Sequence, residues 1–477
     1  MKRTLCFALL SVLLLTLCGC GAREPTAANS PAPAASAVPA WLQESESAAV
    51  PQLPVRTPVS ETQTGGDFEY VLLSDGTAAI TKYTGSAAEP AIPDTLGGAK
   101  VTEIGDNAFS NCDSMTSVTI PEGVESIGVN AFSGCDKLTD VTLPDSVAVV
   151  GANPFLYSLK MKTVHVSPEH PALAVVDGAL YSKADRRLVW FPPAGPQTNC
   201  AIPQGIREIG EQAFYWCENL WNITIPDSVA VIGSGAFTHC TRLTGVVIPA
   251  GVEHIGSSAF SFCTGLNRVT FPEGFSGIPD GMFFSCTGLR NITIPDTVTR
   301  IGEKAFSWCD YLESVTIPGS VREIGLAAFS TCSRLKNADL SEGVTVLGDS
   351  MFSECPLLRS VTLPNTVTVI GDRAFEKTGL SEITIPVSVT RIGKNAFYKC
   401  GNLTAVTIPE GVTAIGESAF MSCENLESAI LPDSLSEIGN AAFAKCPKLT
   451  LVIPHNPTIE QFCSRGRLNF VYADAKE

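Results

Sequence analysis

Apolar and polar residues alternate in short phrases that recur along most of the chain. In residues 315–317 (Val-Thr-Ile) two apolar side chains flank a polar one, which is the period of a half-buried strand. Proline follows and ends the strand, because it has no N–H to donate to a neighbouring strand. A second extended stretch, residues 321–324, ends at Gly325, a residue that permits positive φ. The Ala-Phe segment that comes next is predicted to form a single helical turn before the following strand.

A phenylalanine occupies the same place in each of these units. Its steps are 23 residues, apart from one step of 22 after Phe375 and one of 59 after Phe155. A period of about 20 to 29 residues with regular aliphatic positions indicates stacked coils, because one unit cannot bury its own apolar face. We therefore predict a β-rich repeat solenoid of about 14 repeats of 23 residues across residues 92–454. The series is Phe109, Phe132, Phe155, Phe214, Phe237, Phe260, Phe283, Phe306, Phe329, Phe352, Phe375, Phe397, Phe420 and Phe443.

Both ends of the repeat array carry segments that fit caps. Residues 67–91 are predicted to form an N-terminal cap hairpin, because Asp75-Gly76 is a strong signal for a two-residue turn. Residues 455–477 predict a short helix followed by a strand, as a C-terminal cap. A solenoid needs such caps because a bare terminal coil exposes apolar surface and unpaired strand edges.

The step of 59 residues contains an insertion at about residues 167–200. Its segment 179–191 predicts two strands joined by a turn. One interpretation is a structural spacer between coils. The other is a binding ledge in which Tyr181, Trp190 and Phe191 are presented to a partner.

The first twenty residues form a targeting segment. Two basic residues precede an apolar stretch at residues 4–17, which is too short to span a bilayer. Residues 17–20 (Leu-Cys-Gly-Cys) resemble the bacterial lipobox. The resemblance implies that residues 1–20 are a lipoprotein signal peptide and that Cys20 becomes the acylated N-terminus. An ordinary secretory signal and a membrane helix are the alternatives.

Composition and charge narrow the class of protein. Residues 21–66 are rich in Ala, Pro, Ser and Thr, which predicts a disordered tether, because such a segment cannot bury enough apolar surface to fold. The net charge of the whole chain is −16 and no basic cluster interrupts it. Nucleic acid is therefore excluded as a partner, since binding its backbone requires concentrated Lys and Arg.

Cysteines follow the repeat phenylalanine by three residues in most units. Equivalent positions in stacked strands lie ~4.8 Å apart with parallel side chains, whereas a disulfide needs Cβ atoms roughly 3.5–4.5 Å apart and suitably directed. Ser158 takes the same place in one unit. Free buried thiols are favoured over disulfides and over a metal site. The cysteines are Cys112, Cys135, Cys217, Cys240, Cys263, Cys286, Cys309, Cys332, Cys355, Cys400, Cys423 and Cys446.

Signatures of enzymes are missing from the sequence. It contains no His-Glu-x-x-His, no Gly-x-Ser-x-Gly and no phosphate-binding Gly-x-x-x-x-Gly-Lys-Ser/Thr motif. His239 precedes Cys240, but neighbouring residues on a turn point apart. Acidic residues at the proline turns, such as Glu122 and Asp145, could form a calcium-binding edge, although a solvated turn explains them as well. We predict no catalytic residue, no metal and no cofactor.

The repeated phrases Ile-Gly-x-x-Ala-Phe-x-x-Cys and Val-Thr-Ile-Pro resemble the BspA-type branch of bacterial leucine-rich repeats. They recur in register from about residue 92 to 454, roughly three quarters of the chain. The resemblance implies a leucine-rich-repeat horseshoe with parallel strands lining one face. It also implies exposure on the bacterial cell surface, where some family members act as adhesins for host extracellular proteins.

The outward positions of the first strand in each repeat are the expected place for partner recognition. β-branched residues suit the pleat of a sheet, which gives the threonines there a structural explanation as well. No aromatic cluster on this face identifies a partner. The candidate ligand-binding residues are Arg268, Thr270, Asn291, Thr293, Thr316, Asn337 and Asp339.

These observations predict a non-enzymatic lipoprotein, secreted and anchored at the bacterial cell surface, whose repeats present a scaffold for binding. The expected partner is an extracellular protein or glycan, in adhesion or another contact with host or environment, and the membrane is contacted only through the lipid anchor. The alternative is a structural or envelope-assembly protein that binds the cell's own polymers or partner lipoproteins.

Overall fold

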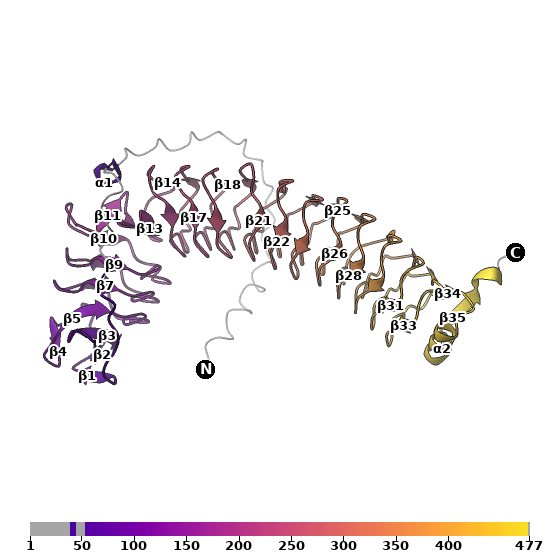
Figure 1. Ribbon diagram of the computed structural model, residues 1–477, viewed down its shortest axis with the longest axis horizontal. Helices are drawn as coiled ribbons and strands as arrows, with labels where there is room; N and C mark the ends of the chain where they lie inside the picture. Colours follow the sequence, from indigo (N-terminus) through magenta and orange to yellow (C-terminus); the bar gives the residue numbers. More distant parts are fainter. Residues whose placement is uncertain (1–38, 44–52, 476–477) are drawn as a thin grey trace, which may run out of the picture. The chain divides into compact units, whose positions relative to one another are not determined.

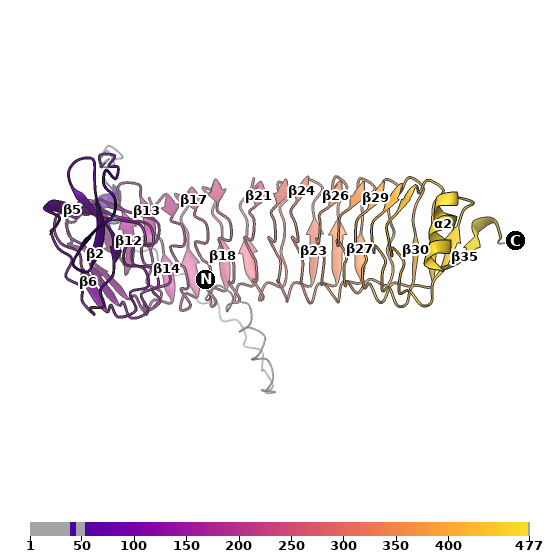
Figure 2. The same cartoon turned by 90° about the horizontal axis from the view of Figure 1, so that it is seen from below.

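The computed structural model describes residues 39–43 and 53–475, all of which belong to one compact unit. Most repeats form one coil with two short strands. The first strand precedes the repeat proline and the second strand precedes the repeat glycine. Figure 2 shows that the first strands lie side by side in one row and the second strands lie side by side in another. The predicted solenoid is confirmed.

The first-strand series runs through the coils to the C-terminal cap. Its members are β6 (Ser117–Thr119), β8 (Asp140–Thr142), β10 (Thr163–His165), β14 (Asn199–Ala201), β16 (Asn222–Thr224), β18 (Gly245–Val247), β20 (Arg268–Thr270), β23 (Ser314–Ile317), β25 (Asn337–Leu340), β27 (Ser360–Thr362), β30 (Ala405–Thr407), β32 (Ser428–Ile430), β34 (Thr450–Ile453) and β35 (Asn469–Tyr472).

The second-strand series forms the other row. Its members are β7 (Ser126–Ile127), β9 (Val149–Val150), β13 (Arg187–Trp190), β15 (Glu208–Ile209), β17 (Val231–Ile232), β19 (His254–Ile255), β21 (Gly277–Ile278), β22 (Arg300–Ile301), β24 (Glu323–Ile324), β26 (Val346–Leu347), β28 (Val369–Ile370), β29 (Arg391–Ile392), β31 (Ala414–Ile415) and β33 (Glu437–Ile438).

Neighbouring coils pair in parallel, with residues one repeat apart opposite each other, as Ser314 and Asn337 are in β23 and β25. The pairing is not continuous within residues 53–475. Residues 291–293 and 382–384 form no strand, and in the second series β19 does not pair with β21, nor β24 with β26. The stack is therefore a succession of short parallel sheets.

The segment around each repeat phenylalanine forms hydrogen-bonded turns rather than a helix, so the predicted helical turn is wrong. Ser258 and Phe262 flank Phe260 with φ of 58° and 57°. A right-handed helix requires negative φ at each residue. The N–H groups bond to the next coil instead, and Phe237 N–H donates to Ala259 O at 2.7 Å. This segment is a third side of the coil.

The repeat phenylalanines form two ring stacks inside the coils, one from Phe109 to Phe155 and one from Phe214 to Phe443, and Phe155 contacts Trp190 edge-on where the first stack ends. Phe214 and Phe237 have ring centroids 4.8 Å apart, and Phe420 and Phe443 are 5.1 Å apart. The stacking is not interrupted where the repeat is 22 residues long, because the ring centroids of Phe375 and Phe397 are 5.3 Å apart. These rings are fully buried. Burying a phenylalanine is worth roughly 1.5–3 kcal/mol, so the repeated ring is a principal source of cohesion between coils.

The insertion is built into the stack as a three-stranded wall. β11 (Leu173–Val176) pairs antiparallel with β12 (Ala179–Ser182), β12 with β13, and β13 continues in parallel to β15. Two hydrophobic clusters meet at this wall: Leu180 and Trp190 belong to the N-terminal cluster, and Tyr181 and Phe191 to the C-terminal one. Alternate side chains of a strand point to opposite faces, so one hairpin serves both cores.

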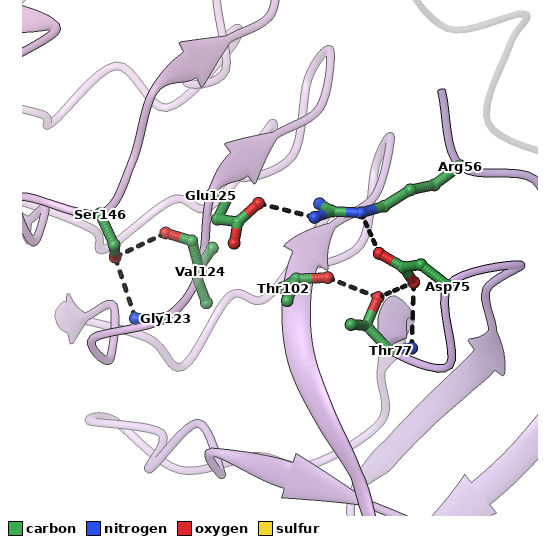
Figure 3. Close-up of polar contacts among 8 residues, drawn as sticks. All are labelled: Arg56, Asp75, Thr77, Thr102, Gly123, Val124, Glu125 and Ser146. Atoms are coloured by element: carbon green, nitrogen blue, oxygen red, sulfur yellow. Dashed lines mark hydrogen bonds and ion pairs between the residues drawn. The ribbon is translucent and has the colours of Figure 1, made fainter. Parts of the chain in front are cut away.

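The N-terminal end of the stack is an antiparallel sheet. It comprises β1 (Gln63–Gly65), β2 (Phe68–Leu72) and β3 (Ala78–Tyr83), and β3 pairs in parallel with β5 (Ala99–Ile104), which also pairs with β4 (Thr95–Leu96). Figure 3 shows how this end is tied to the first coils. Arg56 reaches both Asp75, at 2.6 Å, and Glu125, at 2.7 Å.

Helices occupy the two ends of the described chain. α1 (Ala40–Gln43) places Leu42 in the C-terminal cluster and Trp41 near Tyr181, with ring centroids 6.4 Å apart. α2 (Pro457–Gly466) covers the last coil and is followed by β35 and the 3-10 turn η1 (Ala473–Ala475) (Figure 1). Among the described residues, none of the helices is long and apolar enough to cross a membrane.

Candidate binding surface

The first strands turn alternate side chains outward and inward. In β23, Ser314 and Thr316 are exposed while Val315 and Ile317 are buried, as the two-residue period of a strand requires. We call the exposed side of the first-strand series the strand face. Its inward side holds the apolar core, and its outward side carries mostly polar residues.

The structure places the predicted ligand-binding residues on or beside this face. Arg268 and Thr270 are the exposed ends of β20, and Asn337 and Asp339 are exposed on β25. Asn291 and Thr293 are exposed too, but residues 291–293 form no strand, so the strand expected there is absent. The register brings Thr316 opposite Asp339, and Asp339 opposite Thr362.

Several polar groups on the strand face have no hydrogen-bond partner among residues 39–43 and 53–475. Thr362 donates to Asp339 Oδ1 at 2.8 Å. The hydroxyls of Thr270, Thr293 and Thr316 form no hydrogen bond with any other residue of the described chain, although all three residues are exposed. Cross-strand bonding therefore does not explain these threonines, and their hydroxyls are available to a ligand.

An aromatic and basic strip borders the strand face just before the first strands. The Tyr311 ring lies between two guanidinium groups, with the Arg334 carbon 4.0 Å and the Arg290 carbon 5.6 Å from its centroid. Trp221 has a similar neighbour in Arg242, at 5.8 Å. We call these five residues the aromatic–arginine edge. Tyr311 is 38% exposed and Trp221 46% exposed, so both rings are accessible.

The aromatic–arginine edge carries local positive charge around Tyr311, although the whole chain is acidic. Lys336 bonds to Glu313 at 2.8 Å. That hydrogen bond, with the charges of Lys336, Arg290 and Arg334, lowers the pKa of Glu313. One carboxylate thus stands among three cations. Sequence reasoning missed this cluster because its members are scattered, yet Arg334 follows Tyr311 by one 23-residue repeat, which places them in adjacent coils.

The predicted ledge of the insertion is wrong. Tyr181 and Trp190 are each 1% exposed and Phe191 is 2% exposed, so none of the three is presented to a partner. Burial raises the pKa of Tyr181 far above its ordinary value. Phe191 stacks on Phe214 with centroids 4.8 Å apart, and Trp190 contacts Phe155 edge-on at 5.3 Å. The insertion is a structural spacer that fills the core.

The repeat cysteines are free thiols. Their Sγ atoms donate to the carbonyl of the phenylalanine one coil earlier, as Cys240 does to Phe214 O at 3.2 Å. Ser158 makes the same bond to Phe132 O at 2.7 Å, which explains why serine can replace the cysteine. Burial raises the pKa of the Cys400 thiol to about 11. The ladder is therefore a packing and hydrogen-bonding device.

His239 and Cys240 do not form a catalytic pair. The Cys240 thiol is buried and points to the preceding coil, while the half-buried His239 ring stacks between Trp216, at 3.9 Å, and Phe262, at 4.4 Å. Burial lowers the pKa of His239. In the described chain no three His, Cys, Asp or Glu side chains are grouped so as to hold a metal ion. Cys20 lies outside the described residues.

A stack of two-strand coils with inward aliphatic and phenylalanine ladders defines a leucine-rich-repeat solenoid. The chain belongs to the family described as BspA type leucine-rich repeat region, whose profile matches residues 98–173, 191–311, 277–404 and 345–465. No curated protein sequence matches the chain.

Three solved structures are similar to the chain, and the one with a TM-score above 0.5 agrees on the fold. A leucine-rich repeat protein from Bacteroides ovatus is 24% identical, with a TM-score of 0.55, over 88% of this chain and 99% of that one. A leucine rich cell surface protein from Faecalibacterium prausnitzii is 27% identical over 87% of this chain and 96% of its own, with a TM-score of 0.46. The pneumococcal vaccine antigen PcpA is 18% identical over 87% and 99%, with a TM-score of 0.48.

Proposed function

We propose that this chain is a non-enzymatic, lipid-anchored cell-surface protein that binds an extracellular protein or glycan through the strand face and the aromatic–arginine edge. The binding serves adhesion or another contact with host or environment. The observation that carries the proposal is the exposed Tyr311 between Arg290 and Arg334, beside strand-face hydroxyls that have no partner.

The chemistry of this surface suits recognition. Tyrosine, tryptophan and arginine are the side chains that most often dominate binding energy at interfaces. Thr270 and Thr316 add hydroxyls that donate or accept hydrogen bonds at no cost in broken internal contacts. Membership of a repeat-scaffold family supports the same conclusion, because stacked coils offer an extended surface of regularly spaced side chains.

The anchor is a separate part of the proposal. Cys20, after its apolar leader, would carry the lipid, and the residues between Cys20 and α1 would link it to the repeats. The tether predicted for residues 21–66 is shorter than expected, because Leu42 packs in the core, Arg56 pairs with Glu125, and β1 belongs to the N-terminal sheet. Mass spectrometry of the mature N-terminus from cells should find a diacylglyceryl group on Cys20. The Cys20→Ala variant should lose the lipid and leave the membrane fraction. An unmodified, processed N-terminus at another residue would contradict the anchor and leave the binding surface to be tested by itself.

A binding screen tests the surface. Extracellular-matrix proteins and mucin glycans are immobilised separately, and binding of the chain is measured by biolayer interferometry. Tyr311→Ala with Arg334→Ala should weaken binding by about 30-fold or more, the loss expected for an interface hot spot. The matched control is Tyr157→Ala, which removes a 52% exposed tyrosine outside the aromatic–arginine edge.

Each result of the screen has a meaning. Loss with the paired substitution and retention with Tyr157→Ala supports the proposal. Equal loss with both, or failure to bind across the panel, contradicts it. Recovery of only the cell's own envelope polymers and lipoproteins after crosslinking in cells would favour an assembly role instead.

A further inference from the structure

In one coil of the stack, the first strand and the second strand pair with different neighbouring coils. Its first strand, β20, pairs backward with β18. Its second strand, β21, pairs forward with β22 and not with β19 behind it. The hydrogen-bonded pairing of the second strands is therefore interrupted between β19 and β21.

Three departures from the repeat accompany this opening. Phe271 and Phe275 stand where the preceding coil has Ile248 and Val252, and the two extra rings stack on each other at 4.8 Å. Larger side chains in a packed core force neighbouring backbone apart. Pro279 replaces the repeat glycine and has no N–H to donate across the gap.

The missing hydrogen bonds can be identified from the preceding coil. There, Gly256 N–H donates to Ile232 O at 2.8 Å and Glu253 N–H donates to Ala230 O at 2.9 Å. One coil later the first donor is Pro279, which has none, and the second, Ser276 N–H, has no partner in the described chain.

Two backbone acceptors consequently remain open on the other side of the gap. The carbonyls of Glu253 and Ile255 accept no hydrogen bond from any described residue. An open strand edge of this kind binds an extended peptide through main-chain bonds, as in β-strand addition. The Ser276 N–H supplies a donor across the gap.

The opening forms a cleft of about 570 Å³, within the range of roughly 300–1,000 Å³ typical of ligand sites. Its lining includes Glu253, Glu273, Phe275, Asp280 and Arg300. It lies in the second-strand series and is thus separate from the strand face.

The cleft is acidic. Arg300 is neutralised by Asp280, at 2.9 Å, and by Glu323, at 3.2 Å. Glu253 and Glu273 are exposed and form no ion pair with any described residue. Two free carboxylates and two free carbonyls form a set of acceptors, which matches a ligand rich in N–H donors and positive charge.

We propose that this cleft binds a basic, extended peptide segment of a partner protein. The peptide backbone bonds to the open edge of β19 and to Ser276 N–H. A lysine or arginine side chain of the peptide pairs with Glu253 and Glu273.

Fluorescence anisotropy with labelled peptides tests the proposal. The probe is an acetylated and amidated Lys-Thr-Lys-Thr-Lys peptide, with a Glu-Thr-Glu-Thr-Glu peptide for comparison, and the full chain is used. The native protein should bind the lysine peptide and not the glutamate peptide. The double variant Glu253→Gln with Glu273→Gln should weaken binding by at least about tenfold, the loss expected for charge-assisted hydrogen bonds.

Two further variants separate the cleft from general acidity. Glu122→Gln removes an exposed carboxylate at the same repeat position as Glu273, in a coil whose second strand pairs on both sides, and should leave affinity unchanged. Pro279→Gly restores the missing donor and should close the edge. Slower hydrogen exchange at Ser276 would report the closure directly, and peptide binding should fall with it.

Opposite results overturn the proposal. They are no binding of the lysine peptide, equal binding of both peptides, equal losses for the double variant and Glu122→Gln, or full binding by a Pro279→Gly protein whose Ser276 exchange has slowed. The proposal is independent of the strand-face function, because Tyr311→Ala with Arg334→Ala should not change peptide affinity.

Discussion

The ring of Phe191 stacks on the ring of Phe214, with centroids 4.8 Å apart and an angle of 29° between the planes. This contact places an insertion residue in the column of repeat phenylalanines. The N–H of Phe191 also donates to Ala213 O at 2.8 Å, as the other phenylalanines of the column bond to the next coil. The insertion thus contains a normal coil position that continues the core.

Truncation of Phe191 should behave as a core substitution. We expect Phe191→Ala to lower the free energy of unfolding by about 3–5 kcal/mol, the usual cost of deleting a buried phenylalanine. Phe214→Ala should cost about the same. Trp308→Ala, at a 49% exposed ring, should stay within about 0.5 kcal/mol of the native protein. Urea unfolding followed by circular dichroism measures the stability of all three variants. A Phe191→Ala variant as stable as the native protein would contradict the structural role of Phe191 in the core.

The sequence contained the signal for this position. Phe191 lies 23 residues before Phe214, the normal interval of the series. The repeat position of Phe191 was hard to recognise because Trp190 and Phe191 are followed by two prolines. Aromatic residues at the end of a hairpin suggest exposure as readily as burial. The repeat architecture and the alternation of the strand face were predictable, because both follow from local periodicity.

The interruptions of the ladders were not predictable in this way. Residues 222–227 and 291–296 have the same sequence, Asn-Ile-Thr-Ile-Pro-Asp. The first contains strand β16 and the second contains none. Strand pairing here depends on the spacing between coils, which neighbouring core residues set, and no reading of the phrase alone recovers it. The aromatic–arginine edge was missed for a related reason, since it forms only across coils.

The fully buried repeat cysteines should be unreactive in the native protein and free after unfolding, whereas Cys112 and Cys446, at the ends of the series, are only partly buried. Burial raises the pKa of Cys400 to about 11, so its thiolate is scarce at neutral pH. The hydrogen bond with Cys135 lowers the pKa of Cys112, and that with Cys423 lowers the pKa of Cys446. Maleimide labelling followed by intact mass should be slow for the buried thiols of the native chain, faster at Cys112 and Cys446, and complete in denaturant without reductant. Labelling that requires a reductant would reveal disulfides and contradict the free-thiol structure.

Serine should replace a ladder cysteine better than alanine does. Cys240→Ser retains a donor for Phe214 O, as Ser158 does naturally for Phe132 O. Cys240→Ala loses that bond, but Phe214 O keeps its bond from Cys217 N–H at 3.2 Å. We therefore expect alanine to cost only about 0.5–1.5 kcal/mol, the net worth of one hydrogen bond. Urea midpoints in the order native, serine, alanine support this, and the reverse order of the two variants contradicts it.

The N-terminal end should loosen in acid because of Asp75. Hydrogen bonds from the Thr77 hydroxyl and N–H, together with the Arg56 charge, lower the pKa of Asp75 to about 2 from an ordinary 3.8 (Figure 3). A carboxylate with a depressed pKa stabilises the folded state above its unfolded pKa, and the effect disappears as pH falls through the folded pKa. The protection of β2 and β3 against hydrogen exchange, relative to the intrinsic exchange rate at each pH, should therefore fall between about pH 4 and pH 2. Asp75→Asn should exchange faster at pH 5 and lose much of this acid dependence, whereas an unchanged profile would exclude Asp75 as the cause.

Asn456 should control the closure of the C-terminal end. Its side-chain oxygen accepts from Thr458 N–H at 2.9 Å and from Ile459 N–H at 3.4 Å, which caps the N-terminus of α2. Its amide nitrogen donates to Asp433 O, 2.9 Å away in the preceding coil. Asn456→Ala should cost about 0.5–2 kcal/mol, the typical loss of an N-cap, and hydrogen exchange should rise in α2 and β35 before the rest of the stack.

Asn456→Asp separates the two roles of this residue. Aspartate retains the cap acceptor and adds negative charge at the helix N-terminus, where it is favourable, but it cannot donate to Asp433 O. If capping dominates, exchange in α2 should remain near that of the native chain. If the bond to the preceding coil dominates, Asn456→Asp should open α2 as much as Asn456→Ala does. We expect the first result, because a lost N-cap leaves two helix N–H groups without acceptors. The lost amide donor affects an exposed bond to Asp433 O and a longer one, at 3.4 Å, to Leu435 O.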